Sequence, residues 1–80
     1  MFEKVRDILS DVLELDPERI ESDSLLEDDL GIDSLDVIEL SIEIESEFDI
    51  LIEDREAELL NTVGDLCTLI ESKLSPENED

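Results

Sequence analysis

Apolar residues recur at three- and four-residue spacing at the start of this sequence, at positions Phe2, Val5, Ile8, Leu9, Val12 and Leu13. This spacing places them on one face of an amphipathic helix, which we expect to run to about Leu15. The 80 residues include one cysteine, no histidine and no cluster of metal ligands, so neither a disulfide framework nor a metal site can stabilise the chain. Its stability must come from packing helices of this kind against one another, and we expect a small all-α domain.

A long loop is expected after this first helix. Asp16 and Pro17 read as a cap followed by proline at the first position of a turn. Over residues 18–33 isolated leucines and isoleucines stand among serines and acidic residues, with no helical or strand period. An unstructured loop of this length in a compact domain is either functional or a misassigned element.

The second helix is predicted from Asp33 to about Phe48. Asp33 is a good N-cap residue, and Asp36, three residues later, completes a pair that resembles a capping box.

Two more helices complete the predicted bundle. A short one from Arg55 to Leu60 has Asp54 as its expected cap, and the pair Thr62 and Asp65 is expected to open the last helix. This last helix ends before residues 75–80, which we expect to form a frayed tail. The whole chain is therefore predicted to be one domain, a four-helix bundle with a short third helix and a long loop between the first and second helices.

Acidic residues dominate the charge of the chain, with 27 against 5 basic residues and a net charge of −22. Such a field repels nucleic acid and anionic lipid surfaces, and it attracts basic partners. No stretch approaches the roughly 20 apolar residues of a membrane span, and the N-terminal residues lack the basic and apolar regions of a signal peptide. We therefore expect a cytoplasmic protein, monomeric, with no nucleic-acid or membrane partner.

The second helix has three faces when its residues are placed at 100° intervals. The core face is predicted to hold Val37, Leu40, Ser41, Ile44 and Phe48. The opposite face carries what we call the acidic row: Asp36, Glu39, Glu43 and Glu47. Beside that row runs what we call the apolar strip: Leu35, Ile38 and Ile42. Like charges at helical spacing destabilise a helix by roughly 0.2–0.5 kcal/mol per pair, so the row is either a solvated face or a surface that a basic-rimmed partner groove docks against.

Ser34 stands in the first turn of this helix and has several possible roles. It is a good helix starter, but it cannot act as the nucleophile of a catalytic triad because the chain has no histidine to serve as its base. A calcium loop starting at Asp28 also fails, because Leu30 and Ile32 occupy positions that need oxygen ligands. We therefore expect neither an enzyme nor a metal site, and Ser34 is a candidate hydroxyl for modification by another enzyme. The helix amides favour a phosphodiester there and the charges of Asp33 and Asp36 disfavour one, so local electrostatics give no clear preference.

Residues 29–36 read Asp-Leu-Gly-Ile-Asp-Ser-Leu-Asp and resemble the attachment motif of acyl carrier proteins. The resemblance extends over almost the whole chain, from about Val5 to Leu74, and implies a four-helix bundle with a short third helix. It implies that Ser34, flanked by Asp33 and Leu35, receives phosphopantetheine from coenzyme A through a separate phosphopantetheinyl transferase. The thiol of that arm would carry acyl groups as thioesters, in fatty-acid or a related polyketide or specialised lipid biosynthesis.

The resemblance also implies surfaces for partners and for cargo. Basic patches on the transferase and on acyl synthases would contact the second helix at Leu35, Asp36, Glu39, Ile42, Glu43 and Glu47. The growing acyl chain would lie in an interior cleft lined by residues such as Leu40, Ile44, Ile52 and Leu59.

Some residues depart from the usual family pattern, at Ile50, Leu51, Glu53 and Leu59. They are expected either to enlarge the cleft or to widen the surface that partners contact. Two alternatives to an acyl carrier are an alanyl, aminoacyl or peptidyl carrier, and an acidic helical adaptor without a prosthetic group. The residues Gly31-Ile32-Asp33-Ser34 favour the acyl type, because peptidyl carriers usually have two glycines before the serine pair.

Overall fold

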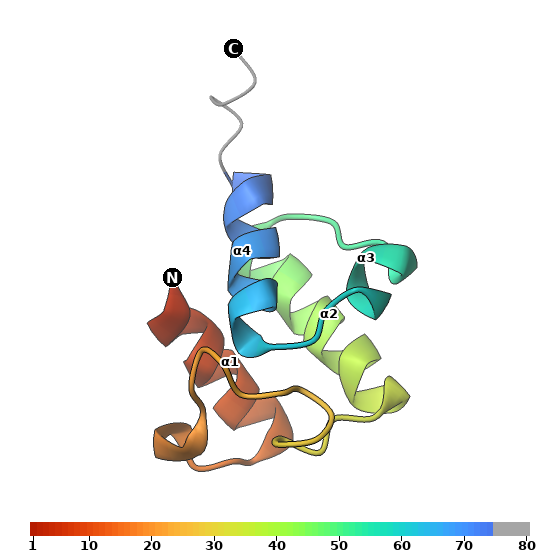
Figure 1. Ribbon diagram of the computed structural model, residues 1–80. Helices are drawn as coiled ribbons and strands as arrows, with labels where there is room; N and C mark the ends of the chain where they lie inside the picture. The colour runs from red at the N-terminus through yellow and green to blue at the C-terminus, as the bar shows by residue number, and fades with distance from the viewer. Residues whose placement is uncertain (75–80) are drawn as a thin grey trace.

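The computed structural model describes residues 1–74, and within this range the regular structure is entirely helical (Figure 1). In chain order the elements are α1 (Phe2–Leu13), the 3₁₀ helix η1 (Pro17–Arg19), α2 (Ser34–Phe48), α3 (Asp54–Glu58) and α4 (Val63–Leu74). The predicted all-α fold with a short third helix is confirmed. The tail predicted for residues 75–80 lies outside the described residues.

One apolar cluster joins the helices, because each amphipathic helix buries one stripe against it. Its fully buried side chains come from three helices: Val5, Leu9, Ile44, Val63 and Ile70. The more extensive contacts between elements all involve α1, which packs against α2, α4 and η1. In Figure 1 the short α3 lies at the edge of the molecule. The core thus sits between α1, α2 and α4.

The segment between α1 and α2 is more structured than its sequence indicates. Residues 17–19 form η1, and Asp16 caps this turn by accepting the N–H of Glu18 at 3.0 Å. Further along, the Leu26 N–H donates to the Asn61 carbonyl at 2.8 Å, so the segment pairs with the residues that precede α4. The long loop predicted over residues 18–33 is therefore present between α1 and α2, with η1 taking up its first two residues and distant backbone partners organising the rest.

The start of α4 has the predicted cap pair. The Asp65 N–H donates to Thr62 Oγ1 at 3.1 Å, and Asp65 Oδ2 accepts the N–H groups of Asn61 at 3.0 Å and of Thr62 at 3.1 Å. These backbone donors, Asn61 first, hold the pKa of the Asp65 carboxyl below its ordinary value. The ionised carboxylate is thus the form that the folded chain favours.

The start of α3 differs from the prediction by one residue. Asp54 is the first residue of α3, and Glu53 precedes it as the N-cap in an extended conformation. The Glu53 N–H donates to Glu56 Oε1 at 3.0 Å, so the acceptor that stabilises this helix start is a glutamate three residues later. The predicted cap at Asp54 and the predicted end at Leu60 are both wrong, since the helix ends at Glu58.

A leucine of the core and a leucine of the surface offer a matched pair of variants. Leu9→Ala removes a fully buried side chain and is expected to lower the free energy of unfolding by about 2–5 kcal/mol. Leu59 is 78% exposed, so Leu59→Ala is expected to change it by no more than about 0.5 kcal/mol. Urea unfolding followed by circular dichroism measures both, and equal losses for the two variants would contradict this description of the core.

Candidate functional site

The backbone turns sharply just before Ser34. Gly31 has a φ of 70°, in the left-handed region that glycine adopts without strain, and its N–H donates to the Glu27 carbonyl at 3.0 Å. The next residue, Ile32, is buried and its N–H donates to the Leu26 carbonyl at 3.0 Å. The chain is thus anchored in the core at Ile32, and Ser34 follows as the exposed first residue of α2.

Two aspartates close the first turn of α2 around Ser34. Asp33 Oδ1 accepts the Asp36 N–H at 2.9 Å, and Asp36 Oδ2 accepts the Asp33 N–H at 3.2 Å. The predicted capping box is therefore confirmed in both directions. Asp33 at the N-cap and Asp36 in the first turn both lie at the N-terminal end of α2, where the helix dipole favours negative charge. This arrangement fixes the position of the Ser34 backbone between the two aspartates.

The core face of α2 is as predicted. Leu40 and Ile44 are buried, and Val37 and Phe48 are half-buried against the same cluster. Ser41, which was predicted on this face, is half-buried and lines the pocket described below.

The apolar strip of α2 faces solvent. Leu35, Ile38 and Ile42 are 66%, 55% and 59% exposed. Branched apolar side chains of this size are usually buried, so a row of three on one helix face is a candidate contact surface. The strip begins one residue after Ser34, at Leu35.

The residues of the acidic row differ in their exposure and in their contacts. Asp36 is half-buried and already accepts a backbone N–H, whereas Glu39, Glu43 and Glu47 are exposed. Two of these, Glu43 and Glu47, border a hollow of about 210 Å³ beside α1 whose other lining residues are Ile8, Asp11 and Val12. Glu39 is thus the exposed acidic residue of the row that borders neither this hollow nor the larger pocket between α2 and α3.

A pocket of about 590 Å³ lies between α2, α3 and the loop that precedes α2, and Ser34 is among its lining residues. Its apolar lining is formed by Leu26, Ile32, Val37, Ile38, Leu40, Ile42, Ile44, Ile52, Ala57, Leu60 and Leu66. Carboxylate-bearing residues of α3 and its approach, Glu53, Asp54 and Glu58, line the same pocket. A hydroxyl open to solvent thus stands beside a largely apolar cavity.

Three of the four residues predicted to line a cleft do so, namely Leu40, Ile44 and Ile52. The prediction is wrong for the fourth residue, Leu59, because its side chain is 78% exposed and does not line the pocket. Its neighbours Ala57, Glu58 and Leu60 line the pocket, whereas the Leu59 side chain lies outside it, just after the end of α3.

The other residues that depart from the family pattern also differ in whether they line the pocket. Leu51 is 69% exposed, as Leu59 is, and adds apolar surface outside the pocket. Ile50 is half-buried against the core, and Glu53 is the departing residue that lines the pocket.

Within residues 1–74 no three histidine, cysteine, aspartate or glutamate side chains are grouped so that they can hold a metal ion. No helix in that range is both long and apolar enough to cross a membrane. What the site offers is an exposed hydroxyl and an apolar pocket beside it. These features fit a long flexible group attached to Ser34, because the hydroxyl is open to another enzyme and the pocket can shelter an apolar end.

The chain matches a family model described as the phosphopantetheine attachment site over residues 3–70. Its fold is similar to that of a proposed acyl carrier protein from Mycobacterium tuberculosis, with a TM-score of 0.83 and 38% sequence identity over 89% of this chain and 95% of that one. It is also similar to an acyl carrier protein from Thermotoga maritima, with a TM-score of 0.79 and 35% identity over 98% of this chain and 88% of that one.

The capping box can be tested without reference to function. Asp33→Ala removes the acceptor of the Asp36 N–H and is expected to lower the free energy of unfolding by about 1 kcal/mol, within a range of 0.5–2. Asp33→Ser keeps a side-chain oxygen at the N-cap and is expected to lose less than half of that amount. Thermal unfolding compares the two, and equal stability of the alanine variant and the native protein would contradict the capping role.

Proposed function

Because the chain belongs to the acyl carrier protein family, whose members carry a covalently attached phosphopantetheine and are not themselves enzymes, we propose that Ser34 bears this group. The observation that carries the proposal is the place of Ser34, exposed at the first turn of α2 and at the lining of an apolar pocket. The left-handed turn at Gly31 and the buried Ile32 support it, because they fix where this hydroxyl is presented. Asp33 and Leu35 flank it as motif residues.

The thiol of the bound arm supplies the chemistry, by holding acyl groups as thioesters. We propose that the chain of the acyl group lies in the pocket between α2 and α3. Each methylene group transferred from water to such a lining gains about 0.8 kcal/mol, so a chain of several methylenes favours the pocket over solvent. The carboxylates of Glu53, Asp54 and Glu58 disfavour an anionic cargo there, since like charges repel. This composition supports an uncharged acyl chain of fatty-acid or related lipid biosynthesis over a cargo that ends in a carboxylate.

Carrier proteins of this family interact with phosphopantetheinyl transferases and with acyl-processing enzymes. We propose that these partners dock on α2 through Leu35 and Ile42 of the apolar strip and through the carboxylates of Asp36, Glu39, Glu43 and Glu47. A net charge of −22 supports basic docking patches, because complementary charge speeds encounter and excludes wrong partners. We further propose that the protein acts as a cytoplasmic monomer.

Loading of the arm tests the attachment site. The full chain is incubated with coenzyme A and a broad-specificity phosphopantetheinyl transferase, and its intact mass is recorded. The native protein is expected to gain one phosphopantetheine, and Ser34→Ala is expected to gain none. Ser46→Ala, at an exposed serine of the same helix, is the matched control and is expected to load fully. No gain in the native protein, or an undiminished gain in Ser34→Ala, would refute the proposal.

Reversal of one charge tests the docking surface. Glu39→Lys places a positive charge at the exposed centre of the acidic row and is expected to weaken binding to the transferase by roughly tenfold, about 1.4 kcal/mol, at low salt. The helix content should stay the same, and the effect should shrink as salt screens the charges.

Glu71→Lys, at an exposed site on α4, makes the same change in net charge away from α2 and is the control. It is expected to keep most of the affinity. Equal affinities of the native protein and both variants would mean that the acidic row is only a solvated face.

A further inference from the structure

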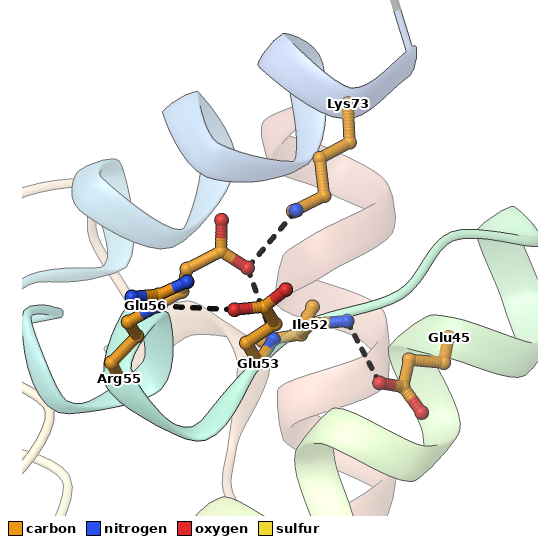
Figure 2. Close-up of polar contacts among 6 residues, drawn as sticks. All are labelled: Glu45, Ile52, Glu53, Arg55, Glu56 and Lys73. Atoms are coloured by element: carbon orange, nitrogen blue, oxygen red, sulfur yellow. Dashed lines mark hydrogen bonds and ion pairs between the residues drawn. The ribbon is translucent and has the colours of Figure 1, made fainter.

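One ion pair joins α3 to α4 (Figure 2). Lys73 Nζ lies 3.0 Å from Glu56 Oε1, and the same oxygen accepts the Glu53 N–H at 3.0 Å. A single carboxylate oxygen therefore both stabilises the start of α3 and binds the ammonium group of α4. Any change at Lys73 acts directly on the turn that begins α3.

Few other interactions hold α3 in place. The helix has five residues, none of them buried, and a helix of this length is not stable by its own hydrogen bonds. Its apolar contacts with the core come from Ala57 and, just after its end, Leu60, both half-buried. The position of α3 therefore depends on polar contacts more than the positions of α1, α2 and α4 do.

The chain that enters α3 is fixed on the opposite side, to α2. Glu45 Oε2 accepts the Ile52 N–H at 2.8 Å, two residues before α3 begins, and both residues line the pocket. Figure 2 places this contact and the Lys73 pair on either side of the α3 entry. The Glu45 contact thus holds the entry to α3, and the Lys73 pair holds the helix itself.

The Lys73–Glu56 pair is also the most sheltered ion pair among residues 1–74. Its side chains are 24% and 30% exposed, against 83% and 53% for Arg55 and Glu53. A sheltered pair is screened less by water and salt than one on the open surface. The Glu53 N–H and then Lys73 hold the pKa of Glu56 below its ordinary value, in agreement with an ionised partner.

Because α3 and its flanking residues form one wall of the pocket, we propose that Lys73 is a positioning residue for the cargo. The ion pair of Lys73 with Glu56 holds α3 against the pocket, and loss of the pair lets that wall move away and exposes the bound acyl chain. This inference rests on the proposed function for its cargo, but not for the contact that holds α3. The two parts are tested by different measurements.

The first measurement is amide hydrogen exchange by NMR on the full chain without any attached group. Lys73→Gln is expected to speed exchange of the Glu53, Ala57 and Leu60 amides by about two- to fivefold, the effect of losing one partly exposed ion pair. Lys73→Arg keeps the charge and is expected to restore the native rates. Lys4→Gln, at an exposed lysine of α1, is the charge-matched control and should leave the amides of α3 unchanged.

Glu56→Gln separates the two roles of the shared oxygen. A glutamine can still accept the Glu53 N–H but cannot form the ion pair. It is expected to speed exchange as Lys73→Gln does, and the double variant should be no faster than either single variant, since both remove one interaction. Additive effects, or exchange in Lys73→Gln equal to that in Lys4→Gln, would overturn the holding role of the pair.

The second measurement uses the protein loaded with an octanoyl arm. Hydroxylamine is expected to cleave the thioester of Lys73→Gln about two- to fivefold faster than that of the native protein, with Lys73→Arg and Lys4→Gln unchanged. Equal cleavage rates in all loaded proteins would overturn the cargo role of Lys73 while leaving the proposed function intact. Failure of the native protein to load would refute the proposed function and the cargo role together, and the exchange rates would still decide whether the pair holds α3.

Discussion

The rest of the structure depends on one apolar cluster, in which Val5 and Leu9 of α1 are buried against Ile44 of α2 and Ile70 of α4. A domain of this size has few such residues, and the same chain carries a net charge of −22 that opposes compaction. The cluster must therefore outweigh the mutual repulsion of the surface carboxylates. It does so with three helices, while α3 remains at its edge, where the pocket forms.

Many carboxylates accept backbone N–H groups at the junctions between elements, and these hydrogen bonds offset part of the electrostatic repulsion among the acidic side chains. Asp33 and Asp36 do this at the start of α2, Glu56 at the start of α3 and Asp65 at the start of α4. These residues hold the backbone, and Glu39, Glu43 and Glu47 remain exposed. The acidic composition therefore has two separate consequences, one for the local structure and one for the surface that a basic partner can contact. The proposed roles of Ser34 and of α2 depend on both.

The features that could be predicted are those decided by neighbours in the sequence. The bounds of α2 and its capping box follow from Asp33 and Asp36, three residues apart, and its exposed apolar strip follows from helical period alone. The register of α3 could not be predicted, because Glu56 binds Lys73 on another helix and accepts the N–H of Glu53, which is the N-cap in place of Asp54. The expectation that Leu59 lines the cleft rests on the family resemblance alone, and this leucine is exposed outside the pocket. The pairing of residues 22–26 with residues 61–64 joins distant segments, and no local signal in the sequence indicates it.

Attachment of the arm at Ser34 is the central claim, and its direct test is to locate the arm within the chain. Trypsin is expected to release residues 20–55 of the loaded protein as one peptide, because Arg19 and Arg55 bound a stretch without lysine or arginine. This peptide contains five serines, at positions 22, 24, 34, 41 and 46, which tandem mass spectrometry can distinguish by their fragment masses. The account predicts that the added mass lies on Ser34 alone. An added mass on any of the other four serines would contradict it.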